Sequence, residues 1–207
     1  MGSKEELLNE VIEIEWKMFE DVVNIGGLAA CQEDPATFKI MRYSQGMSWS
    51  EPVLQSYLND LKEAEKSGRN LLSEKYARMM ESTSPLEYEN IHHLVPTLEP
   101  EIPPLIDRIV EIMLEWQEEV SEKFPYITGG GRPIHMSEDS RFVTSFETYL
   151  RGELATYSKR TLELYYKNIS EQKSKKVNAA EVVLDYMVRE YGYKSAEEAN
   201  ERLRTQG

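Results

Sequence analysis

Hydrophobic residues recur along this chain every three or four positions, which is the spacing of the buried face of an α-helix. The first such run begins at a capping box, in which Ser3 and Glu6 satisfy two backbone N–H groups at a helix start. We expect Gly26 and Gly27 to end this helix. Its apolar face consists of Leu7, Leu8, Val11, Ile12, Met18, Phe19, Val22 and Val23.

The same periodicity predicts further helices, several of which carry their own start signals. Asp34 with Pro35 and Ser50 with Pro52 each combine a capping side chain with a proline in the first turn. No internal repeat and no strand-like alternation is present, so the sequence predicts an all-α bundle of about eight helices without a sheet. The later helical segments are expected near residues 35–43, 50–67, 69–81, 86–94, 105–124, 140–170 with a break at Gly152, 179–191, and from 195 onward.

Four prolines lie close together between residues 96 and 104. Because proline fixes φ and cannot donate a backbone hydrogen bond, we expect this segment to be extended and semi-rigid. It is the strongest candidate for a boundary within the chain. The sequence therefore predicts a single helical domain over residues 1–207, with a division into two lobes at 96–104 as the alternative.

Charge, apolar run length and cysteine content limit the classes of partner and the expected location of this protein. The chain has 24 Lys and Arg against 37 Asp and Glu, which gives a net charge of −13. This balance argues against nucleic acid and anionic membrane as partners, since both require clustered basic residues. No apolar run reaches the roughly 18 residues of a membrane span, and Cys31 has no second cysteine with which to form a disulfide. The expected location is the cytoplasm.

Five runs in this sequence, residues 16–19, 26–32, 38–45, 70–80 and 145–154, together resemble an uncharacterised bacterial family, one of the domains of unknown function. The resemblance covers the chain up to about Tyr166. It implies a bacterial cytosolic protein. It brings no activity, ligand or catalytic residue with it, so the chemistry has to be read from the residues themselves.

Two glutamates interrupt apolar helix faces. Glu15 lies one turn after Ile12 and one turn before Phe19, and Glu153 lies one turn before Tyr157. A buried carboxylate needs a partner, because an isolated ionised one is too costly to desolvate. Two interpretations stay open. The glutamates line a polar cavity and serve as acid, base or ligand, or each is paired with a structural Arg, Lys or Tyr.

Other polar residues of the second half of the chain suggest a ligand that is planar or anionic. Tyrosine rings near Arg151 could line a cleft, although half-buried packing also explains them. The glycines before Arg132 could present N–H groups to an anion, but they lack the phosphate-binding motifs and fit a connector better. We hypothesise a cleft between the first helix and residues 140–170, with Glu15, Tyr149 and Glu153 as catalytic candidates and Arg132, Arg151 and Tyr157 as ligand-binding candidates.

A metal site is the least supported alternative. Glu89 and His92 have the E-x-x-H spacing of di-iron helical bundles, which use two such pairs, whereas this chain has one. We therefore expect no metal, and no motif indicates a cofactor or an oligomeric state. Two functions remain open: a small-molecule binding or enzymatic protein, and a non-catalytic helical protein–protein interaction module.

Overall fold

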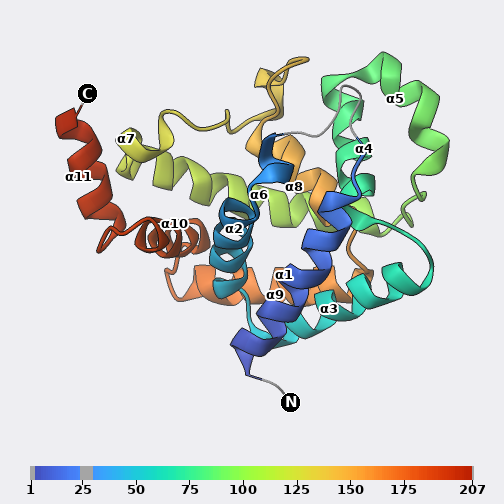
Figure 1. Ribbon diagram of the computed structural model, residues 1–207, viewed down its shortest axis with the longest axis horizontal. Helices are drawn as coiled ribbons and strands as arrows, with labels where there is room; N and C mark the ends of the chain where they lie inside the picture. The colour runs from blue at the N-terminus through green and yellow to red at the C-terminus, as the bar shows by residue number, and fades with distance from the viewer. Residues whose placement is uncertain (1–2, 24–29, 207) are drawn as a thin grey trace.

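A computed structural model describes residues 3–23 and 30–206 of the chain (Figure 1). These residues form eleven α-helices and three short 3-10 helices, and the only strand-like pairing among them is an isolated bridge between Ser140 and Val143. The all-α class is confirmed for this part of the chain, but the expectation of about eight helices was wrong. The α-helices are α1 (Lys4–Glu20), α2 (Pro35–Met47), α3 (Glu51–Lys66), α4 (Leu71–Thr83), α5 (Pro85–Ile91), α6 (Ile102–Lys123), α7 (Pro125–Thr128), α8 (Phe146–Leu154), α9 (Lys159–Ser174), α10 (Ala179–Glu190) and α11 (Ala196–Gln206).

Several predicted helix starts are confirmed. At α1 the Ser3 N–H donates to Glu6 at 2.7 Å, and the Ser3 hydroxyl accepts the Glu6 N–H, which completes the capping box. Asp34 accepts the Thr37 N–H at 3.0 Å and starts α2. Gly26 and Gly27, predicted to end the first helix, lie outside the described residues. Local hydrogen bonds between residues three apart thus set these starts.

Two segments differ from the prediction for identifiable physical reasons. Pro103 and Pro104 were expected in an extended segment but lie in the first turn of α6, where the missing N–H groups have no helical acceptor in any case. Gly152 was expected to break the 140–170 region but lies inside α8. A Cβ at Gly152 would lie 3.0 Å from the Lys75 carbonyl oxygen, so this glycine permits close packing of α8 against α4. The break falls instead at residues 155–158.

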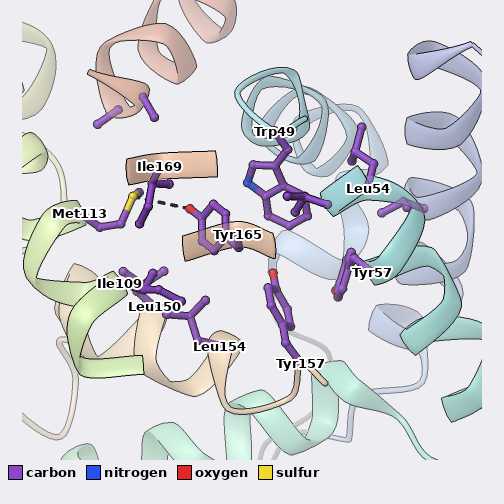
Figure 2. Packing of buried hydrophobic residues seen from close by; sticks show 14 of the residues in the cluster. Trp49, Leu54, Tyr57, Ile109, Met113, Leu150, Leu154, Tyr157, Tyr165 and Ile169 are labelled. Atoms are coloured by element: carbon purple, nitrogen blue, oxygen red, sulfur yellow. Dashed lines mark hydrogen bonds between the residues drawn. The ribbon is translucent and has the colours of Figure 1, made fainter. Parts of the chain in front are cut away.

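The buried apolar side chains form one cluster. Within it, α1 packs on α3, α4 on α8, and α6 on both α9 and α10. Figure 2 shows Trp49 beside Tyr57, Tyr157 and Tyr165, and the Tyr165 hydroxyl directed at the sulfur of Met113, 3.5 Å away. The ring centroids of Tyr57 and Tyr157 are 4.6 Å apart. This aromatic group brings α3 and the α8–α9 connection together at the centre of the molecule.

The remaining helices extend from this centre to two sides. In Figure 1, α10 and α11 lie on the side opposite to α4 and α5. Over residues 3–23 and 30–206, no helix is both long enough and apolar enough to cross a bilayer. Whether the chain is one domain, or two lobes divided at 96–104, stays a prediction.

Candidate functional site

A buried ion pair joins the first two helices of the chain. Glu15 of α1 is fully buried, and Arg42 of α2 approaches it with two donors, Nε at 2.8 Å from Oε2 and Nη2 to Oε1. The hydroxyl of Tyr57 donates to the same Oε1 at 2.7 Å. Both oxygens of Glu15 therefore accept hydrogen bonds, and its charge lies directly against a guanidinium.

The second predicted carboxylate meets the same guanidinium from the other side. Glu153 of α8 accepts a hydrogen bond from Arg42 Nη1 at 3.0 Å and from the Tyr157 hydroxyl at 2.8 Å, both at Oε1. Gln45 donates to the same atom at 3.1 Å. Lys75 of α4, only 2% exposed, donates to Oε2 at 2.6 Å. We call Glu15, Arg42, Lys75 and Glu153 the buried charge network.

The charges in this network are balanced, with two carboxylates against two cations. Burial alone would raise the pKa of Glu153, but Arg42 and Lys75 outweigh it and hold that pKa well below the ordinary value. Burial alone would likewise lower the pKa of Arg42, but Glu15 and Glu153 keep it well above the ordinary value. Glu153 is thus ionised at neutral pH, and every one of its oxygens is engaged.

Tyrosines cover the network, and one of them connects it to the surface. Burial and the nearby carboxylates raise the pKa of Tyr57 and of Tyr157 well above ordinary values, so both hydroxyls remain donors. Tyr149 is half-buried, and Lys75 Nζ lies 3.5 Å from its ring centroid while the guanidinium of Arg132 lies 4.7 Å from it. Burial alone would raise the pKa of Tyr149, but Lys75 lowers it overall.

Helix α8 divides the predicted site residues between two places. Tyr149, Glu153 and Tyr157 belong to the network or its cover, whereas Arg151 points to the opposite face of α8 and pairs with Glu147 at 2.9 Å and with Asp107 at 2.6 Å. Arg132 is exposed, and donates to the Thr144 carbonyl at 3.0 Å. The structure thus joins Glu15, Glu153, Tyr149 and Tyr157 through Arg42 and Lys75, and it leaves Arg151 outside.

A pocket of about 400 Å³ lies on the Arg151 face of α8, between this helix, α4 and α6. Its walls are mostly apolar. Two of its hydroxyl groups are already engaged, because Ser82 and Thr148 each donate to Asp139 at 2.5 Å. The apolar walls are Leu98, Pro103, Ile106, Met136 and Ala155, and the charged ones are Arg78, Glu81, Asp107 and Arg151.

Arg78 differs from the other charged groups of this pocket. It is half-buried on α4 and donates from Nη2 to the Pro96 carbonyl at 2.6 Å. Its Nε is buried and makes no hydrogen bond. Within residues 3–23 and 30–206, no carboxylate lies within 4.0 Å of its guanidinium. Burial lowers the pKa of Arg78, whereas the carboxylates beside Arg151 outweigh burial and raise its pKa.

Comparison with models of protein families gives a match over most of the sequence. The model of a family described as "Protein of unknown function (DUF4125)" matches residues 5–201. The chain belongs to the DUF4125 family. The resemblance to a domain of unknown function is thereby confirmed, and it extends well past Tyr166. No curated protein and no solved structure matches this DUF4125 chain.

In this DUF4125 chain, the E-x-x-H pair stands apart from the buried glutamates. Glu89 on α5 and His92 at its end are exposed, whereas Glu15 and Glu153 are buried. His92 Nδ1 lies 2.9 Å from the Glu89 carbonyl oxygen, a local contact within one turn. In the part of the chain that the structure describes, no three His, Cys, Asp or Glu side chains gather as a metal site would require.

Sequence reasoning missed both cations of the network and, of the two arginines that line the pocket, Arg78. A signal for Lys75 was present, because it lies three residues after Leu72 and four before Met79, on the apolar face of its helix. Arg42 likewise follows Phe38 by four residues. Arg78 carries no comparable signal, since the proline segment that covers it is close to it only in the folded chain.

Proposed function

We propose that this protein binds a small molecule in the pocket between α4, α6 and α8. The observation that carries the proposal is the pocket itself: about 400 Å³, mostly apolar walls, and a few charged groups at fixed positions. Small-molecule sites are typically concave and apolar, with volumes of about 300–1,000 Å³ and a small number of placed polar groups. The size favours a small ligand over a large cofactor.

The buried charge network supports this function by holding α8 in place. Its carboxylates are saturated with donors, and a Glu153 that is ionised throughout the neutral range carries no proton to exchange. The network therefore fits an anchor better than acid–base chemistry. A catalytic role for Glu15, Glu153 or Tyr149 stays a prediction, as does a cleft between α1 and α8.

A fragment screen with a pocket-filling variant tests the proposal. Ala155 is half-buried and lines the pocket, so Ala155→Phe should fill it, whereas Ala36→Phe on the exposed start of α2 adds the same ring elsewhere. We expect ligand-observed NMR to find fragments that bind the wild type and Ala36→Phe but not Ala155→Phe. Fragments that bind all three proteins equally, or no binding fragments at all, would contradict the proposal.

The helical interaction module remains a second candidate because of two exposed apolar side chains. Leu86 on α5 is 77% exposed and Phe142 is 91% exposed. Arg141 and Glu87, their sequence neighbours, lie 3.9 Å apart, so both apolar side chains belong to one region of the surface. Sedimentation velocity over a concentration series should show self-association that the double variant Leu86→Ser, Phe142→Ser abolishes. A wild type that stays monomeric throughout would count against this candidate.

A further inference from the structure

The charged groups of the pocket between α4, α6 and α8 are unequally compensated. Arg151 has two carboxylate partners, Glu147 and Asp107, at hydrogen-bond distance. Arg78 has none within 4.0 Å in the described residues, and it donates to the neutral Pro96 carbonyl instead. The half-buried guanidinium of Arg78 is therefore the pocket cation with no carboxylate at ion-pair distance, since Glu74 and the exposed Glu81 act on it only from farther away.

Both features of Arg78 favour an anionic partner. A half-buried cation without a carboxylate in contact loses hydration, and the hydrogen bond to the Pro96 carbonyl restores only part of it. A guanidinium also presents its N–H donors in a planar fork that matches a carboxylate. The Nε of Arg78 has almost no accessible surface, so a ligand in the pocket would meet the terminal nitrogens of the guanidinium instead. An anion at these terminal nitrogens would give Arg78 a counter-charge at contact distance.

We infer that the ligand of this pocket is an amphipathic monoanion whose anionic head binds Arg78 and whose apolar body lies against Leu98, Pro103 and Ile106. The inference rests on the proposed function, since it names the class of small molecule that the pocket takes. A single negative charge matches the one pocket cation that has no carboxylate at ion-pair distance. A dianion would place an excess negative charge near Glu81 and Asp107, which also line the pocket.

Three probes with one eight-carbon chain separate these possibilities: octanoate, octanol and octyl phosphate. Each is titrated into the full chain by isothermal calorimetry. Hydrogen bonds to a charged group contribute enough to predict that octanoate binds at least roughly tenfold more tightly than octanol. Octyl phosphate, as a dianion, is expected to bind more weakly than octanoate.

Variants assign the preference to Arg78. Arg78→Gln should reduce octanoate affinity to that of octanol and leave octanol binding unchanged, and Arg78→Lys should lie between the two because it keeps the charge without the fork. Arg160→Gln, an exposed arginine on α9, is the matched control and should bind like the wild type. Circular dichroism checks that each variant has the helical content of the wild type.

The outcomes distinguish this inference from the proposed function. Equal binding of octanoate and octanol, both abolished by Ala155→Phe, would overturn the anion preference and leave the pocket function standing. An octanoate preference that Arg78→Gln does not change would also overturn it. If no octyl probe binds, but neutral fragments bind the wild type and not Ala155→Phe, the inference fails and the proposed function stands. If no compound binds the wild type more tightly than Ala155→Phe, both fail.

Discussion

Replacing Lys75 by Met should destabilise the protein strongly. The Lys75 side chain is 2% exposed, its Nζ lies 2.6 Å from Glu153 Oε2, and its charge completes the balance of the buried network. Met preserves most of the volume but removes the cation, so the two buried carboxylates are left with Arg42 alone. Breaking a buried ion pair by removing one partner costs about 3–5 kcal/mol.

The expected change in melting temperature follows from the size of the chain. For a protein of 207 residues, each kcal/mol corresponds to roughly 2–4 °C. Lys75→Met should therefore lower Tm by roughly 6–20 °C. Thermal unfolding followed by circular dichroism measures the shift, and urea unfolding supplies the free energy.

An exposed ion pair supplies the control. Lys62 pairs with Glu10 at 2.6 Å, but the two side chains are 42% and 47% exposed. Lys62→Met should cost less than about 1 kcal/mol, because water screens an exposed pair. The double variant Lys75→Met, Glu153→Gln should recover part of the loss, since it removes the uncompensated charge as well. If Lys75→Met costs no more than Lys62→Met, the network does not hold desolvated charge as we describe.

Three further predictions concern helix α8. Gly152→Ala should destabilise by about 1–3 kcal/mol, because its Cβ would lie 3.0 Å from both the Lys75 carbonyl oxygen and Met79 Cγ; a urea midpoint like that of the wild type would contradict this. The folded-state pKa of Glu153 is depressed, so its ionised form stabilises the folded protein fully above the ordinary pKa of 4.5, and this stabilisation is lost as the pH falls below that value. The free energies of unfolding of the wild type and Glu153→Gln, measured in urea, should therefore differ less at acid pH than at neutral pH. Tyr149 should ionise below the ordinary pKa of 10.0, and the absorbance titration of Tyr149→Phe should lack that early step.

The helix starts were predictable because their signals are local. Ser3 with Glu6 and Asp34 with Pro35 act within one turn of chain, and the structure has both caps. The interruption of the 140–170 region was misplaced because Gly152 was interpreted as a helix breaker. Its conformation is ordinary for a helix, and its small size serves a contact with Lys75 of α4, which is far away in the sequence.

The candidate site was predictable only in part, for a related reason. Periodicity identified Glu15 and Glu153 as carboxylates on apolar faces, and both are buried. Their partners come from other helices, with 27 residues separating Glu15 from Arg42 and 78 separating Glu153 from Lys75. Such pairings depend on how helices pack, which single-sequence periodicity does not contain. Helix geometry could have separated Arg151 from Glu153, because residues two apart point to nearly opposite sides.

The two faces of α8 suggest how the network and the pocket depend on each other. Glu153 fixes one face of the helix to Arg42 and Lys75, while Thr148, Arg151 and Ala155 on the other face form a wall of the pocket. None of the four network residues lines that pocket. A network variant that still folds should therefore weaken ligand binding only by loosening the position of α8, and the loss should be similar for charged and neutral ligands. A variant at Arg78 acts by direct contact instead, so its loss should be confined to anions.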